Sequence, residues 1–410
     1  MFKNIVLFKD LGILLTKSQK NILLFILATT ISFMWANYST YYISNIEVYM
    51  MMFSVLLLLT KGKGMMDYNE TKKVRPLFLA SFVIYFFITL IIHGEKFSVS
   101  VLCCLLLGYC VLSLKPKFKI WIYDRFISVL ALLFGLSALE YLLAVFWGIS
   151  YINHTPIYRF ESNEHYFYQG IITVFPYLYK TSLVRFQAFT EEPGLVGTLC
   201  AFLLACIDIK RHKWQLAVFV VCGILSMSLA FYLIFVLWIG YMMFNVKNIK
   251  YNIILFVFIA IICFLAQDEI TELVMGRLAE KGNISDLDNR GTYSFKTAFD
   301  EFIVSSDAVF GRGLRTYHST FSGVSKESGG NAGAKPFIYS YGLFSMLLLF
   351  FSYSKCFLKV NGSNIKAFFI LFIFWLSFYQ REYWYTPYNM IPLFMYGLYD
   401  QYMKSLKIIK

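Results

Sequence analysis

Two polar stretches of the chain carry the residues whose types and spacing suit chemistry on a charged substrate. The first stretch ends with Arg185 and the run Glu191-Glu192-Pro193-Gly194. A guanidinium at a membrane face suits a phosphate or diphosphate, because it offers parallel N–H groups and a permanent charge. Glu192 is a candidate general base. It also has a plain structural role, since carboxylates and proline favour the first turn of a helix.

The second polar stretch contains a glycine-rich turn with two arginines. The sequence Phe310-Gly311-Arg312-Gly313-Leu314 predicts a tight turn whose backbone N–H groups form a nest for an anion. Arg312 and the nearby Arg315 add positive charge to that nest. The alternatives remain open, because many G-x-G sequences are simple turns and a loop arginine is often only solvated.

Three other groups in the second stretch are candidates for chemistry. Arg290 precedes a helical pattern, and His318 is a candidate base, although a lone loop histidine is more often a bystander. Asp286 and Asp288 have the spacing of a metal-binding carboxylate pair, but no histidine lies near them. We therefore expect no metal site and no cofactor.

The elements that hold these residues are membrane helices. The chain has 410 residues, of which 59% are hydrophobic and 15% charged, with a mean hydropathy of +0.62. Soluble domains are about half apolar and a quarter charged, so this composition indicates an integral membrane protein. All eight cysteines fall in apolar runs, which excludes a disulfide framework and a cysteine metal site. The net charge of +13 lies mainly in short loops between apolar runs, which excludes nucleic-acid binding.

Apolar runs of membrane length predict an all-α membrane protein with about twelve transmembrane helices. We treat residues 1–410 as a single polytopic membrane domain with two large loops, at 149–192 and 267–335. The stretch 214–245 has positive charge at both ends, so it needs two short spans, broken at Ser226-Met227-Ser228. The predicted spans are 21–38, 44–60, 76–93, 98–114, 126–148, 193–208, 214–227, 229–245, 252–266, 336–354, 366–380 and 387–400.

The lysines and arginines of the short loops predict the orientation. Most of the 37 basic residues fall in segments that this rule places inside, so both termini are expected in the cytoplasm and both large loops outside. We expect short amphipathic helices in these loops. One helical face comprises Phe295, Ala298, Phe299, Phe302 and Ile303, and another comprises Ile270, Leu273, Val274 and Leu278. An inert folded cap is the alternative to a site.

Glu140 lies inside the fifth predicted span. A carboxylate within a membrane is costly and is a functional candidate for that reason. A position near the outer face, paired with a tyrosine or a loop arginine, is an equally good interpretation.

The arginine, the glutamate-proline pair and the serine-containing break together resemble a known family. Arg185 stands eight positions before Pro193, which opens a predicted span and follows Glu192. This pattern is similar to a motif of the O-antigen polymerase and ligase superfamily. The break between two short spans at Ser226 and Ser228 resembles that family too, as does the layout of twelve spans along most of the chain.

The second loop extends the resemblance and also shows where the chain departs from it. Arg290 ahead of an amphipathic helix and the turn from Gly311 to Gly313 are similar to the family's later outer loop. The glycine often found three positions after the first arginine is Ala188 here. The His-Asn pair of the ligase branch is missing, since the segment 328–344 has Asn331 without an adjacent histidine. This difference favours the polymerase branch.

The resemblance implies transfer of a glycan from undecaprenyl diphosphate to the terminal sugar of another lipid-linked repeat unit. Arginines would stabilise the diphosphate, and a glutamate or histidine would act as base or bind a sugar hydroxyl. The implied catalytic residues are Arg185, Glu192, Arg290 and His318. The implied substrate-binding residues are Glu191, Gly311, Arg312, Gly313 and Arg315.

The resemblance also implies a bacterial inner-membrane location with the active face in the periplasm. The expected partners are the lipid-linked oligosaccharide, membrane lipid and a chain-length regulator protein, with no nucleic acid. One alternative is an O-antigen ligase that moves finished glycan onto lipid A core. Another is a flippase or transporter of lipid-linked sugars, although such proteins concentrate polar residues at the membrane midplane. A polymerase for capsule or exopolysaccharide fits the sequence equally well.

Overall fold

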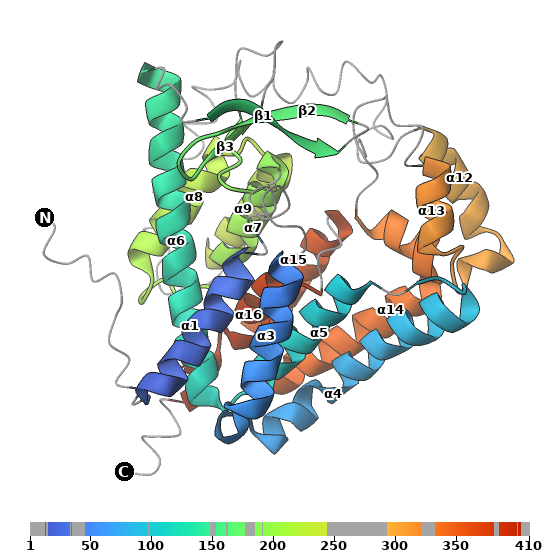
Figure 1. Cartoon of the computed structure of the whole chain (residues 1–410), viewed down its shortest axis with the longest axis horizontal. Helices are drawn as coiled ribbons and strands as arrows, with labels where there is room; N and C mark the ends of the chain where they lie inside the picture. Colours follow the sequence, from blue (N-terminus) through green and yellow to red (C-terminus); the bar gives the residue numbers. More distant parts are fainter. Residues whose placement is uncertain are drawn as a thin grey trace, which may run out of the picture.

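The architecture is mostly helical (Figure 1). The computed structural model describes residues 13, 15–32, 34, 46–96, 98–147, 153–160, 163–176, 185–190, 192–243, 293–321, 333–380, 385–399 and 401–402. Arg290, Glu191, the pair Asp286 and Asp288, the helical face at 270–278 and the predicted span 252–266 therefore lie outside the described residues.

Each of the other eleven predicted spans corresponds to a helix. These helices are α1 (Lys17–Ser32), α3 (Ile46–Thr60), α4 (Tyr68–Phe82) with its π-helical continuation η3 (Val83–Ile92), α5 (Val99–Leu112), α6 (Pro116–Trp147), α7 (Pro193–Cys206), α8 (Lys213–Leu225), α9 (Leu229–Met243), α14 (Ala334–Asn361), α15 (Ile365–Gln380) and α16 (Pro387–Met395). Within the described part of the chain, three helices are long and apolar enough to cross a membrane: Tyr68–Ile92, Pro116–Trp147 and Ala334–Asn361.

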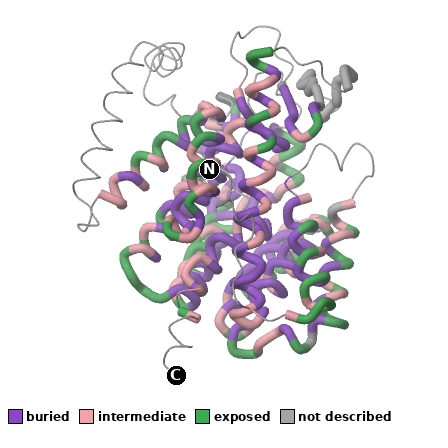
Figure 2. The backbone as a smooth tube through the Cα atoms, turned by 90° about the vertical axis from the view of Figure 1, so that its left-hand side faces the viewer, coloured by how far each residue is buried: buried purple, intermediate pink, exposed green. Residues whose placement is uncertain are grey.

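The surface of these helices is apolar where a soluble protein would be polar. Leu56, Phe87, Val236 and Phe351 are each about half exposed or more. Such side chains suit contact with lipid tails. Figure 2 shows the buried residues in the middle of the bundle and exposed ones along its outer helices. The seven cysteines that the structure describes are free and buried in this bundle, as their apolar surroundings predict.

The predicted break between two short helices is confirmed. Helix α8 ends at Leu225 and α9 begins at Leu229, with Ser226, Met227 and Ser228 in the turn. Met227 has a φ of +48°, which lies in the left-handed region. Both α8 and α9 pack on α7, so the break lies beside that helix.

The first polar stretch contains a sheet, and the expectation of short amphipathic helices there is wrong for its described part. Strands β1 (Asn153–Phe160), β2 (Asn163–Gln169) and β3 (Val174–Pro176) form an antiparallel sheet in the order β1-β2-β3. Ile157 pairs with Phe167, and Phe167 pairs with Pro176. Consecutive aromatic residues in β2 show no helical or strand period, so only cross-strand pairing reveals the sheet.

The second polar stretch contains the amphipathic helix that its apolar spacing predicts. This is α12 (Tyr293–Ile303), and Phe295, Phe299 and Phe302 on its inner face are buried. They form a small separate core with Phe321 of α13 (Leu314–Phe321) and Tyr339 of α14. The short helix η6 (Ser306–Ala308) connects α12 to the glycine-rich turn. Figure 1 shows α12 and α13 at one side of the bundle, near the start of α14.

Candidate active site

Arg185 lies against the turn between α8 and α9. Its Nε donates to the carbonyl oxygen of Ser226 at 3.2 Å, and its Nη2 donates to the carbonyl of Met227 at 3.1 Å. The next residue, Phe186, donates its backbone N–H to the carbonyl of Leu225 at 3.2 Å. Carbonyls are neutral acceptors, so these contacts orient the guanidinium without cancelling its positive charge. The first arginine and the serine-containing break, which are far apart in sequence, thus form one structural unit.

The turn can take this position because α7 has a glycine beneath it. A Cβ atom at Gly197 would lie 2.3 Å from Cβ of Ser228 and 2.7 Å from Oγ of Ser226. Only glycine permits such a close approach of a helix to a turn. Ser226 closes the end of α8 by donating its hydroxyl to the carbonyl of Gly223 at 2.6 Å. The small residue at position 197 therefore allows α7 to pack against the turn that holds Arg185.

Glu192 is the residue that caps the N-terminus of α7. Its backbone is extended, its carbonyl accepts from Leu195 N–H at 3.0 Å, and Pro193 occupies the first turn. The Glu192 side chain makes no capping hydrogen bond and is exposed. The structural role predicted for Glu192 is thus confirmed for its backbone. The Glu192 carboxylate is exposed at the helix end where the Arg185 segment lies. The role of Glu192 as a general base therefore stays a prediction.

Ala188 and Gln187 complete the segment that carries Arg185. Ala188 has a φ of +49°, a left-handed conformation that favours glycine. The Gln187 side chain is 1% exposed, and its Nε2 has no hydrogen-bond partner among the described residues. No sequence pattern singles out Gln187, because a buried amide in a polar loop has the same local sequence as a solvated one.

Glu140 connects α6 to the sheet above the Arg185 segment. Its carboxylate accepts backbone hydrogen bonds from Ile171 at 2.5 Å, Ile172 at 2.9 Å and Thr173 at 2.8 Å. Gly170 makes room for it, since a Cβ there would lie 2.1 Å from Oε1. The partner of Glu140 is therefore backbone of the first polar stretch, and the tyrosine or loop arginine of one of the two interpretations is not the partner seen here.

The sheet in turn connects to the segment that carries Arg185. Val174 of β3 donates its N–H to the carbonyl of Ala188 at 2.7 Å. Phe189 and Phe186 pack on Phe134 and Tyr141 of α6, with ring centroids 5.3 Å apart in both pairs. Helix α6, the sheet and the Arg185 segment are thus continuous, and Glu140 is a positioning residue for that segment.

The glycine-rich turn uses its backbone N–H groups within the protein. Gly311 donates to Asp307 at 2.7 Å, Arg312 to Tyr339 at 2.8 Å and Gly313 to Ser340 at 3.0 Å, all at carbonyl oxygens. The carbonyls of Tyr339 and Ser340 lie just before the kink of α14 at Gly342, whose φ is +83°. The N–H groups expected to bind an anionic ligand therefore bond to η6 and to the start of α14.

A carboxylate of the protein occupies the next two N–H groups. Glu95, which follows η3, accepts from Leu314 at 3.0 Å and from Arg315 at 2.8 Å, and so caps α13. His93 Nε2 makes a second contact, with the carbonyl of Phe310 at 3.0 Å. These contacts tie the glycine-rich turn to the end of η3. The anion at the N-terminus of α13 is thus the carboxylate of Glu95, which lies more than 200 positions earlier in the sequence and which no local spacing could identify.

The remaining candidates of the second stretch differ in their surroundings. Arg312 pairs with Asp307 at 2.9 Å and reaches the Tyr339 hydroxyl at 3.4 Å. The hydrogen bonds to Tyr339 and to Asp307 raise the pKa of Arg312 above its ordinary value, so it stays charged. Arg315 and His318 are exposed on α13. Arg312 therefore has a structural role, whereas Arg315 presents its charge to the surroundings.

The predicted site residues form two groups in the described part of the chain. The group with Arg185 and Glu192 contacts α6 to α9, and the group with Arg312, Arg315 and His318 lies on η3 and α14. No cluster of three or more potential metal-ligating side chains occurs among the described residues. Comparisons with protein-family models, with curated proteins and with solved structures found no match to this chain.

Proposed function

We propose that the protein is a membrane glycosyltransferase that polymerises lipid-linked oligosaccharide repeat units into O-antigen or a related surface polysaccharide. The observation that carries this proposal is the contact of Arg185 with the Ser226–Met227 turn beside the start of α7. Two carbonyls hold its guanidinium at 3.2 and 3.1 Å. Three features resemble the polymerase and ligase superfamily: the arginine, the glutamate-proline pair and the serine-containing break. All three lie near the start of α7.

The proposed reaction joins two lipid-linked glycans. A hydroxyl oxygen of the acceptor sugar attacks the anomeric carbon of the donor, and the bond from that carbon to undecaprenyl diphosphate breaks. The diphosphate leaves with the bonding electron pair, and a base takes the hydroxyl proton. Arg185 and Arg290 stabilise the charge on the leaving diphosphate, and Arg315 supports them. Glu192 is the first choice of base and His318 the second.

The proposed topology places this reaction at the periplasmic face of the bacterial inner membrane. Twelve spans with both termini in the cytoplasm put both polar stretches outside. The sheet and the α12–α13 pair then cover the outer ends of the helices. An undecaprenyl chain can lie along the apolar outer surface of the bundle, and a chain-length regulator protein is a partner on the same side. No cofactor is needed, because the diphosphate-linked donor carries the driving force.

The test uses a strain that lacks the gene and carries plasmid copies of it. Wild-type protein should restore a ladder of polysaccharide lengths on a gel, and Arg185→Ala should give single repeat units only. Arg185→Lys should restore the ladder only in part, because lysine lacks the planar pair of donors. Arg75→Ala is the matched control, since Arg75 is exposed on α4, and it should behave as wild type.

Other outcomes of this experiment point to other functions. A full ladder with Arg185→Ala at equal protein level would rule out the diphosphate role of Arg185. Long lipid-linked polymer that accumulates without transfer in the deletion strain would identify a ligase. Single lipid-linked units trapped on the cytoplasmic side would identify a flippase.

A further inference from the structure

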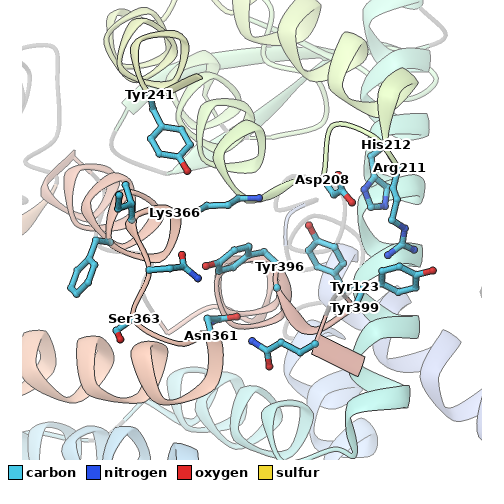
Figure 3. A pocket seen from close by; sticks show the side chains of 15 residues that line it. Tyr123, Asp208, Arg211, His212, Tyr241, Asn361, Ser363, Lys366, Tyr396 and Tyr399 are labelled. Atoms are coloured by element: carbon cyan, nitrogen blue, oxygen red, sulfur yellow. The ribbon is translucent and has the colours of Figure 1, made fainter. Parts of the chain in front are cut away.

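A cleft of about 900 Å³ opens at the end of the bundle where α6 begins (Figure 3). Its lining comes from the first turns of α6, from the α7–α8 turn, from Tyr241 of α9, from the α14–α15 turn with the start of α15, and from the residues after α16. A volume of this size is in the range of small-molecule sites. The cleft takes no part in the site around Arg185.

The cleft lies at the opposite end of α6 from the Arg185 segment. Asp124 of α6 holds two residues of the cleft lining, Arg211 and His212, whereas Glu140 of α6 holds the sheet. With a rise of about 1.5 Å per residue, the two carboxylates are about 24 Å apart along the helix axis, close to the thickness of a bilayer core of about 30 Å. The cleft therefore faces the other side of the membrane.

Two cations are held in place at this cleft. The Asp124 carboxylate contacts Arg211 at 2.8 Å and His212 at 3.2 Å, and the Arg211 guanidinium lies over the ring of Tyr399 with 3.5 Å to its centroid. Lys366 lies over the ring of Tyr396 with 5.3 Å to its centroid. Figure 3 shows Lys366 and Arg211 on opposite sides of the cleft, with Tyr396 and Tyr123 between them. An anion beside Lys366 and the outer face of Arg211 would meet both cations, while the Asp208 carboxylate lines another part of the same cleft.

The first turn of α15 adds hydrogen-bond donors to the same wall. Ser363, Asn364, Ile365 and Lys366 all line the cleft. Asn364 caps the helix, because its Oδ1 accepts from the N–H of Ala367 at 2.8 Å. The N–H groups of Ile365 and Lys366 are those that a helix leaves without partners at its start, and they favour a phosphate.

A buried amide supplies an independent indication of a ligand. Asn361 lines the cleft, is 4% exposed, and donates its Nδ2 to the carbonyls of Phe357 and Leu393. Its Oδ1 is buried with no hydrogen-bond partner among the described residues. Gly397 packs beside this oxygen, since a Cβ there would lie 3.4 Å from it. A buried acceptor without a donor is costly, so a bound group with a hydroxyl would satisfy it.

We propose that this cleft binds a ligand that combines a phosphate with hydroxyl groups, of the glycerol-phosphate or sugar-phosphate type. Arg211, Lys366 and the start of α15 bind the phosphate, and Asn361 accepts from a hydroxyl. The tyrosine rings cover the carbon skeleton between them. The same chemistry occurs in the headgroup of phosphatidylglycerol and in soluble phosphorylated polyols. Only the assignment of the cleft to the cytoplasmic face rests on the proposed function.

The test measures binding to the purified full-length protein without any measurement of polymer. Glycerol 1-phosphate is titrated while thermal unfolding in detergent is followed, with glycerol alone as the control ligand. In parallel, the protein is placed in nanodiscs of phosphatidylglycerol or of phosphatidylcholine, and retained lipid is identified by native mass spectrometry. A midpoint raised by glycerol 1-phosphate indicates a soluble ligand. Selective retention of phosphatidylglycerol, without that shift, indicates a lipid headgroup.

Matched variants decide whether the cleft is the site. Lys366→Glu should weaken binding by about tenfold or more, as expected for loss of a charge-assisted contact. Asn364→Asp keeps the helix cap, adds a repelling charge and should weaken binding as well. Lys359→Glu is the control, because Lys359 is exposed on α14 and does not line the cleft. The proposal is overturned if neither probe binds, if glycerol alone binds as well, or if Lys366→Glu and Asn364→Asp both bind like Lys359→Glu.

Discussion

The two ends of α6 each place a carboxylate against another part of the chain, but the two carboxylates are satisfied differently. At one end, both oxygens of Glu140 accept backbone N–H groups from three consecutive residues. At the other end, Arg211 and His212 share Oδ1 of Asp124, and Oδ2 is buried without a partner among the described residues.

The different partners of Glu140 and Asp124 indicate different roles for the two ends of α6. A carboxylate that is fully hydrogen-bonded to backbone fixes the geometry of a loop, as Glu140 does for the sheet and the Arg185 segment. Unsatisfied buried polar atoms are rare in folded proteins, and among the described residues they occur at both ends: at Asp124, His212 and Asn361 near the cleft, and at Ser137 and Gln187 near the sheet. The Glu140 end therefore fixes the backbone of the sheet, whereas the Asp124 end holds two side chains that line the cleft, Arg211 and His212.

The largest expected effect comes from Asp124→Asn, which removes the charge that holds the cleft together. Arg211 and His212 would lose their common partner, and the free energy of unfolding should fall by about 3 kcal/mol. Glycerol 1-phosphate should bind more weakly, because Arg211 is no longer held in place. Thermal unfolding in detergent, with and without that ligand, measures both effects. Asp307→Asn is the control, since Asp307 is half exposed in its pair with Arg312. Equal midpoints for the two variants would contradict the structural role of Asp124.

Glu140→Gln tests the opposite end of the helix. Glutamine has a similar shape, but its NH2 group would face N–H donors, so the free energy of unfolding should fall by about 2–3 kcal/mol. Protease should cut the polypeptide between residues 153 and 176 faster, and the polysaccharide ladder should be lost. Binding at the cleft should persist, which would show that the two ends act separately. Glu301→Gln, at an exposed site on α12, is the control. A ladder of wild-type length from Glu140→Gln would remove its positioning role.

Gly197→Ala tests the contact between α7 and the Ser226–Ser228 turn. The added methyl group would lie 2.3 Å from Ser228 Cβ, and such overpacking should cost about 1–2 kcal/mol and shift the turn that holds Arg185. The polysaccharide ladder should shorten. Gly240→Ala on α9 is the matched control, because a Cβ there meets no atom within 4 Å. If both variants give full ladders and equal unfolding midpoints, the close packing of α7 on the turn has no functional weight.

Ala188→Gly should have the smallest effect. Glycine removes the strain of the left-handed backbone at this position but also makes the unfolded chain more flexible, so the two changes nearly cancel, to within about 0.5 kcal/mol. Activity should stay at the wild-type level. Ala188→Val should instead destabilise the protein and shorten the ladder, since a β-branched residue disfavours a positive φ. The unfolding midpoints of the two variants check this, and equal values would show that φ at this residue is unimportant.

Local patterns in the chain were enough to predict the elements that depend on neighbouring residues. The break at Ser226–Ser228 followed from charges on both sides of a stretch too long for one short span, and α12 followed from apolar residues at helical spacing. The sheet was missed, because the residues of β2 carry no period and pair only with strands that fold back on them. The proposed membrane topology extends the same local patterns to the whole chain.

The sequence by itself determined the apolar composition, the helix positions and the places where charge gathers, since each depends on residues close together in the chain. Only the tertiary structure decided which partners these charges have. Arg185 meets carbonyls of a turn more than 40 positions away, Glu140 meets backbone of the sheet, and Glu95 caps α13 from the far end of η3. It also assembled the cleft from five separate segments. Backbone groups and long-range packing leave no local pattern, so contacts of this kind appear only when the helices pack.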